Sequence, residues 1–213
     1  MSDGAPWGWP TLFLLGAYHG INPGMGWLFA VALGMQEKRA QAVARSLAPI
    51  ALGHAIAIGA VILLAGLVRI VLPLRYIKFA VAGALLGLGL LRLVRSRHFR
   101  WGGMQVGFRD LTIWSFLMAS AHGAGLMVLP VVLRLNPEPV AAAHHQHVNS
   151  SQGLLTGIGA TLVHTLGYLT LTTAVAFAVY QWLGLALLRK AWLNLDLVWA
   201  VALIATSCFA LTI

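Results

Sequence analysis

Long apolar runs recur along the whole of this 213-residue chain, and they restrict its fold more than any other feature. Only 9% of the residues are charged and 60% are hydrophobic, whereas about 25% of the residues in a soluble domain are charged. Crossing roughly 30 Å of hydrocarbon takes about 20 helical residues, and apolar runs of that length are repeated here. The sequence therefore excludes a water-soluble monomer and predicts an all-α, polytopic protein whose main partner is the lipid bilayer.

The apolar runs divide into six predicted transmembrane helices within a single domain. We expect them at residues 9–35, 43–72, 76–94, 111–133, 154–187 and 191–213. A basic loop, about residues 96–109, follows the third helix, and a loop rich in Pro, Asn, Ser and His, residues 135–152, follows the fourth. The N-terminal sequence MSDGAPWGW lacks the basic region of a cleaved signal peptide, so we expect the first helix to begin at Trp9.

The positions of the basic residues predict the orientation of these helices, because Lys and Arg stay preferentially on the cytoplasmic side. If both termini lie outside, the inner connections hold ten of the 14 basic residues, and the outer side holds Arg69, Arg75, Lys78 and Arg134. The net charge of +9 then reflects membrane topology, and we expect no nucleic-acid partner. The prediction is an integral protein of a bacterial inner membrane, with both termini and the His-containing loop outside.

A short internal repeat relates the two halves of the chain, about residues 9–95 and 110–213. Residues 13–20, FLLGAYHG, match residues 116–123, FLMASAHG, at four of eight positions. The second copy lies three predicted helices after the first, so it enters the membrane from the opposite face. This is the 3+3 inverted-repeat plan of many transporters.

Four histidines lie well inside the predicted helices: His19, His54, His122 and His164. Ionisable residues are costly at that depth and usually face the interior of the bundle. A single histidine of this kind is more often a packing residue, but four at repeat-related positions favour a shared site. Because imidazole binds nickel, cobalt, zinc and copper well, we expect a metal site near the midplane.

The residues that follow His19 disfavour a continuous helix. Pro23 cannot donate a hydrogen bond to the carbonyl of His19, and Gly24 weakens the helix further. We therefore expect a kink or an unwound turn, and broken membrane helices commonly use their freed carbonyls to line a binding site.

Two further groups of residues accompany the histidines. Thr161 and Tyr168 lie within one helical turn of His164, where they either orient its ring or serve as hydrogen-bonding contacts between helices. His144, His145 and His147 lie in the predicted outer loop, where they either capture metal before uptake or belong to an ordinary solvated loop.

Two of these elements resemble motifs of the nickel/cobalt permeases and their HupE/UreJ-like relatives. That family carries His-x-x-Asp-x-Asp-His in its first part and Leu-Gly-His-Ser in the following span. The corresponding residues here are His19-Gly-Ile-Asn22-Pro-Gly24-Met25 and Leu52-Gly53-His54-Ala55. The resemblance implies that His19, Asn22, Met25 and His54 are metal ligands, and the internal repeat adds His122. Where the family has two Asp and a second His, this chain has Asn22, Gly24 and Met25, which makes the site less anionic and softer and favours either a different ion, such as copper(I), or no metal.

The leading expectation is a permease rather than an enzyme. It moves a transition-metal ion as its substrate by alternating access, has no tightly bound cofactor, and works alone, as a homo-oligomer or with a partner subunit. Two alternatives stay open. One is an exporter of a small organic solute such as an amino acid, and the other is a membrane metal-binding assembly protein or metalloenzyme.

Overall fold

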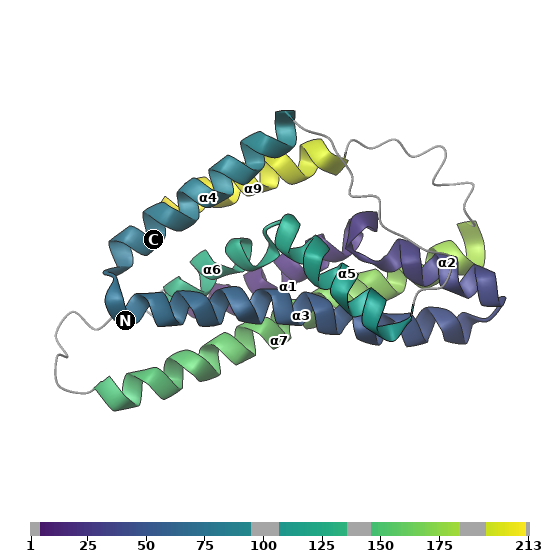
Figure 1. Cartoon of the computed structure of the whole chain (residues 1–213), viewed down its shortest axis with the longest axis horizontal. Coiled ribbons are helices and arrows are strands. Elements are labelled where there is room, and N and C mark those ends of the chain that lie inside the picture. The colour runs from purple at the N-terminus through teal and green to yellow at the C-terminus, as the bar shows by residue number, and fades with distance from the viewer. Residues whose placement is uncertain (1–4, 95–106, 136–145, 184–194, 212–213) are drawn as a thin grey trace.

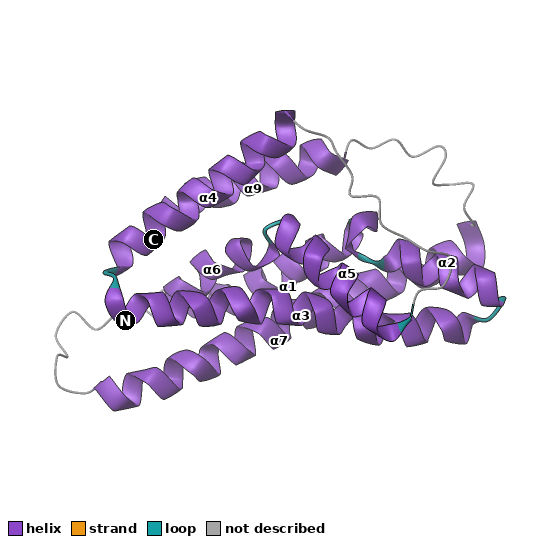
Figure 2. Ribbon diagram, viewed as in Figure 1, coloured by secondary structure: helices purple, strands orange, loops and turns teal. Residues whose placement is uncertain are grey.

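The computed structural model describes residues 5–94, 107–135, 146–183 and 195–211, and all regular structure in these ranges is helical (Figure 2). The helices are α1 Ala5–Ile21, α2 Trp27–Glu37, α3 Ala40–Val71, α4 Leu74–Val94, α5 Phe108–Ala121, α6 Ala124–Leu135, α7 Gln146–Ala178 and α9 Leu195–Leu211. A 3-10 turn, η1 Pro23–Met25, and a π-helical turn, η2 Val179–Leu183, complete the described elements. The predicted all-α class is confirmed.

Two of the described helical segments are individually long and apolar enough to cross a bilayer. They are Ala40–Val68 of α3 and Gly153–Trp182 of α7 with η2. Helices α5 and α6 form a third segment if the pair, which is bent by 65°, counts as one span. These lengths support a membrane protein, but they do not by themselves demonstrate six crossings.

The first predicted helix breaks where the sequence indicated. Helix α1 ends at Ile21, and the backbone of Asn22 is extended before η1 begins at Pro23. The Asn22 side chain accepts a hydrogen bond from the Gly24 backbone N–H at 2.9 Å. Gly26 then adopts φ 131°, which L side chains rarely take, and α2 starts one residue later. The broken helix predicted from Pro23 and Gly24 is confirmed.

A second break, at His122 and Gly123, was not expected, because the sequence analysis treated residues 111–133 as one helix. Helix α5 ends at Ala121 and α6 begins at Ala124. No proline marks this break; it depends on Gly123, whose φ of 71° lies in the left-handed region that favours glycine. The continuous helix was therefore a wrong prediction, since a lone glycine in an apolar run gives little local signal.

The predicted outer loop is also partly corrected. Helix α7 already begins at Gln146, so residues 146–152, including His147, are helical rather than part of a loop. The segment after Gln146 contains no proline, and its polar residues fit an aqueous first turn of a helix. His144 and His145 lie outside the described residues, as do residues 95–106 of the basic loop region and residues 184–194, which include the end of the fifth predicted helix and the start of the sixth.

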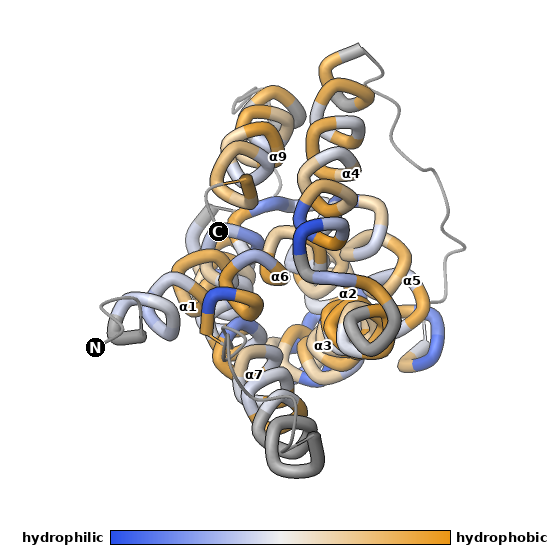
Figure 3. Tube along the Cα trace, turned by 90° about the vertical axis from the view of Figure 1, so that its left-hand side faces the viewer, coloured by the Kyte–Doolittle hydropathy of each residue, from blue (hydrophilic) through white to orange (hydrophobic). Residues whose placement is uncertain are grey.

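The helices associate mainly in three pairs: α1 with α7, α3 with α5, and α4 with α9. The α4–α9 pair forms a layer of its own above the remaining helices (Figures 1 and 3). The other two pairs approach closely through glycines. A Cβ on Gly16 would collide with the His164 carbonyl, one on Gly167 with the Phe13 carbonyl, and one on Gly53 with the Thr112 carbonyl. Small residues permit this backbone contact, as is common between membrane helices.

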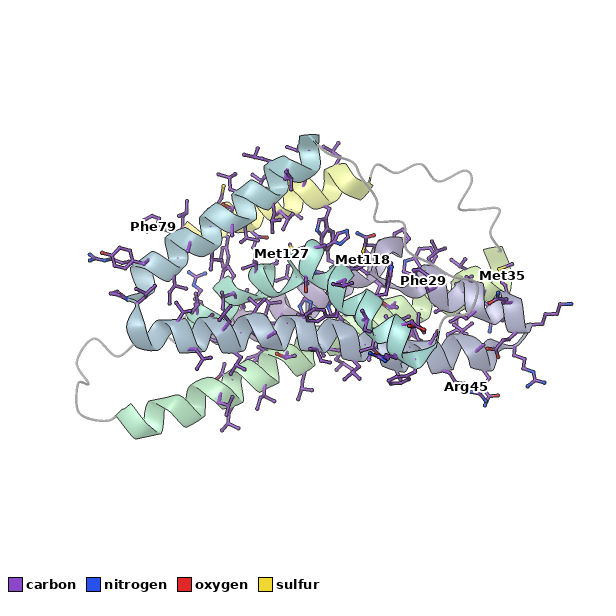
Figure 4. All side chains as sticks on the ribbon, in the orientation of Figure 1. Phe29, Met35, Arg45, Phe79, Met118 and Met127 are labelled. Atoms are coloured by element: carbon purple, nitrogen blue, oxygen red, sulfur yellow. The ribbon has the colours of Figure 1, made fainter. Side chains whose placement is uncertain are left out.

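Basic residues lie at both ends of the bundle. Helices α1, α2, α4 and α7 run from left to right in Figure 1, whereas α3, α5, α6 and α9 run in the opposite direction. The right-hand end, called the basic end here after its exposed residues Lys38, Arg39, Arg45 and Arg109, also carries Glu37 and Asp110, and the left-hand end carries Arg75, Lys78 and Arg134. Figure 4 labels Arg45 there, and Phe79 of α4 marks the opposite end, where the N and C marks of Figure 1 also lie.

Candidate functional site: a buried histidine centre

Three of the four predicted histidines meet in the middle of the bundle. His19 comes from α1, His54 from α3 and His164 from α7, and none of the three side chains is exposed. Their ring centroids are 5.6 Å apart for His19 and His54, 5.0 Å for His19 and His164, and 5.5 Å for His54 and His164. These three residues are called the histidine centre.

A hydrogen bond within α1 orients the His19 ring. Its Nδ1–H donates to the Leu15 carbonyl at 2.7 Å, because a carbonyl oxygen can only accept. In the neutral ring this bond leaves the lone pair on Nε2, and Nε2 is buried without a hydrogen-bond partner. A histidine whose other nitrogen is bonded to a backbone carbonyl is the usual form of a metal-binding histidine.

The other two rings have still fewer polar contacts. Both nitrogens of His54 and both nitrogens of His164 are buried without a hydrogen-bond partner. The Leu12 carbonyl lies near His164, but the contact does not have hydrogen-bond geometry. Leaving a buried polar group unsatisfied costs about 1–3 kcal/mol, so an arrangement with five such nitrogens favours occupation by an ion or by water.

Aromatic rings enclose the centre on two sides. The ring of Tyr168 stacks on His54 with centroids 4.0 Å apart, and Trp199 of α9 meets His19 edge to face at 4.7 Å. Tyr18 stacks on Trp199 at 5.0 Å and also meets the His19 ring edge to face at 6.2 Å. Sequence reasoning missed Trp199 altogether; its only local signal was a tryptophan inside an apolar run rather than at the end of one.

His122, the fourth predicted histidine, lies next to the centre, and Trp199 contacts both His122 and His19. The rings of His122 and Trp199 are 5.3 Å apart, and Trp199 Nε1–H donates to the His122 carbonyl at 2.9 Å. The His122 Nδ1–H donates to the Met118 carbonyl at 2.8 Å, which repeats the bond from His19 to Leu15. His122 thus shares the local geometry of His19 without joining the cluster of three rings.

The remaining candidates occupy other positions. The Asn22 amide oxygen caps η1, and Met25 is buried with its backbone carbonyl accepting a hydrogen bond from the Tyr168 hydroxyl. Tyr168 therefore contacts His54 and the broken helix rather than serving His164. The Thr161 hydroxyl donates to the Gly157 carbonyl of its own helix at 2.9 Å. His147 lies in the first turn of α7, far along the helix from His164.

The spacing of the three rings suits a single metal ion, but their orientations do not. Imidazoles bound to one tetrahedral ion at about 2.0–2.1 Å have ring centroids roughly 5 Å apart, close to the separations in the centre. Among the described residues, however, no group of three or more His, Cys, Asp or Glu is arranged to hold an ion. His54 and His164 lie nearly parallel, with 10° between their planes, so binding requires at least one ring to turn.

Comparisons of the chain with protein families, with curated proteins and with solved structures find no match. What we propose about its function therefore rests on the residues of the histidine centre.

Proposed function

We propose that the chain is a membrane permease that moves a transition-metal ion through the histidine centre by alternating access. One observation carries the proposal: three helices bring three buried imidazoles within 5.0–5.6 Å of one another, and five of their nitrogens have no partner. A packing role leaves these nitrogens unsatisfied at a cost, whereas nickel, cobalt, zinc and copper ions all bind imidazole nitrogen.

The charge balance of the centre bears on the choice of ion. None of the five acidic residues of the sequence falls in the middle of an apolar helix, and in the part of the chain that the structure describes no carboxylate accompanies the three rings. A buried charge without a partner is costly, and the cost is greater for a divalent than for a monovalent cation. The centre thus favours either a soft monovalent ion such as copper(I), or a divalent nickel- or cobalt-like ion that brings its own anion.

The pairing of the helices supports the 3+3 inverted repeat that we include in the proposal. We take residues 9–95 and 110–213 as the halves, so that α7 of the second half corresponds to α3 of the first. Helix α1, which begins the first half, packs on α7. In the same way α5, which begins the second half, packs on α3, and the last helices of the halves, α4 and α9, pair with each other. Both halves begin with a broken helix, and a histidine precedes or occupies each break. Exchange of equivalent partners is what a two-fold relation between the halves produces.

Metal binding by the purified protein is the first test. Calorimetric titration with Ni²⁺, Co²⁺, Zn²⁺ and Cu⁺ should detect one site per chain for at least one ion, and His54→Ala should abolish it. Thr170→Ala is the matched control, because Thr170 is exposed on the same helix and its hydroxyl donates to the Leu166 carbonyl. Absence of binding of all four ions, or equal loss in both variants, contradicts the proposal.

Flux into proteoliposomes then separates a permease from its alternatives. We expect the unmodified protein to take up metal and the His54→Ala variant to take up none. Tight binding without flux would instead indicate an assembly protein or a metalloenzyme. Export of an organic solute that tolerates His54→Gln would indicate the solute exporter.

A further inference from the structure

We infer that the hydroxyls of Ser115, Tyr168 and Thr172 line the route between the histidine centre and the basic end, and that the Tyr168 hydroxyl closes it. The inference rests on the proposed function, because it assigns the pathway by which an ion leaves or enters the same centre.

The hydroxyls form a polar row on the buried face of α7. His164, Tyr168 and Thr172 follow one another at intervals of four residues, so they share one face of the helix, and none of the three is exposed. The row starts at the centre and leads toward the basic end (Figure 1). Ser115 of α5 adds a third buried hydroxyl, which lies near the Tyr168 phenol and donates to the Ile50 carbonyl at 2.6 Å.

The buried hydroxyl of Thr172 has no hydrogen-bond partner. Its Oγ1 lies near the Tyr168 phenol, yet it is fully buried and the geometry gives it no hydrogen bond. It packs against Gly20 of α1, the residue directly after His19, where an added Cβ would lie 3.0 Å from this oxygen. A threonine used only for packing usually satisfies its hydroxyl within its own helix, as Thr161 and Thr170 do. An unsatisfied hydroxyl next to the centre favours passage of a polar species.

On the opposite side of the centre, the buried residues include a second apolar cluster. Toward the other end of the bundle the buried residues form an apolar cluster that includes Leu12, Ile58, Val128, Val131 and Ala160. If the two halves are related as proposed, Ile58 of α3 is the counterpart of Tyr168 of α7, since each lies four residues after its histidine. Ile58 closes its side of the centre by apolar packing alone, whereas Tyr168 also forms a hydrogen bond through its hydroxyl.

The contacts of Tyr168 make it suited to act as a gate. Its ring stacks on His54, and its hydroxyl donates to the Met25 carbonyl at the break of the first helix. A ring rotation of His54 on binding an ion therefore acts directly on Tyr168 and, through it, on η1. Beyond Thr172 the buried residues are apolar on this side as well, among them Val31, Val43 and Ala176, so opening it requires the Tyr168 hydrogen bond to break and these residues to separate.

Thiol accessibility tests the route without any metal. Cys208 is the single cysteine, so Cys208→Ser yields a background for Thr172→Cys and for its control Ala160→Cys, which is equally buried on α7 on the other side of His164. A membrane-impermeant methanethiosulfonate is added separately to each face of reconstituted vesicles. We expect T172C to react from the basic end and A160C to react at least about tenfold more slowly from either end. Adding Tyr168→Phe to T172C should speed its reaction several-fold, up to about tenfold, as expected for loss of one hydrogen bond.

Equal rates for T172C and A160C overturn the inference, and so does a Tyr168→Phe effect that is absent or equal at both positions. The comparison of T172C with A160C keeps Tyr168 intact, so it decides the route even if Tyr168→Phe does not fold. Because no metal is added, a failure here is distinct from a failure of the proposed function, which appears as absent metal binding.

Discussion

The ring of Tyr168 lies parallel to the imidazole of His54, with centroids 4.0 Å apart and 10° between the planes, and the Tyr168 hydroxyl donates a hydrogen bond to the Met25 carbonyl. Two substitutions of Tyr168 distinguish the contributions of these two contacts. Tyr168→Phe keeps the stacked ring and loses only the hydrogen bond, so it should lower the free energy of unfolding by about 1 kcal/mol. Tyr168→Ala also removes a fully buried ring, and it should cost about 3–5 kcal/mol. Equilibrium unfolding in mixed micelles measures both; equal costs would show that the ring contact contributes nothing.

The crossing of α1 and α7 should be sensitive to a single methyl group. A Cβ on Gly16 would overlap the His164 carbonyl, so Gly16→Ala must separate the two backbones and should destabilise the protein by about 1–3 kcal/mol. The same shift displaces His164 and should weaken metal binding. Gly59→Ala is the control, since a Cβ there meets nothing within 4 Å, and its effect should stay within about 1 kcal/mol because alanine favours a helix over glycine by that amount. The thermal midpoints of the two variants should therefore differ clearly, and coincident midpoints would contradict the close crossing.

Trp199 should support the histidine centre without binding metal itself. It contacts His19 edge to face, and its Nε1–H donates to the His122 carbonyl. Trp199→Phe removes this hydrogen bond and loosens the packing of His19, so metal affinity should fall about 10–100-fold, the range found for residues that orient metal ligands. Trp182→Phe is the matched control, because Trp182 is 81% exposed. Titration of both variants with the ion that binds the unmodified protein provides the measurement, and an unaltered affinity in Trp199→Phe would exclude a supporting role.

Metal binding should weaken as the pH falls. Ions and protons compete for the same ring nitrogens, and an ordinary histidine takes up a proton near pH 6.5. Binding needs the neutral rings, so affinity should decrease once the pH is low enough to protonate them, and it should recover when the pH is raised again. Isothermal titration in buffers of different ionisation enthalpy also counts the protons released. A pH-independent affinity would indicate that the ion is held by groups other than imidazole.

Several features were determined by the sequence alone because their causes are local. Hydropathy averaged over a helix length predicted the helical class, and Pro23 with Gly24 predicted the break after His19. That buried histidines converge followed from the cost of exposing an imidazole to lipid, which applies to each residue by itself. The structure brings the rings of three of them together, whereas the sequence predicted one site for all four.

Only the tertiary structure decided which neighbours each ring has. Tyr168 follows His164 by one helical turn, yet it stacks on His54, because the side chain reaches across to α3 rather than along its own helix. Trp199 is distant in sequence from both His19 and His122, and it contacts both rings because α9 packs over the centre. Contacts of this kind depend on how closely helices cross, which Gly16, Gly53 and Gly167 control through backbone approach. No local pattern reports such crossings, because each requires two segments far apart in the chain to pack against each other.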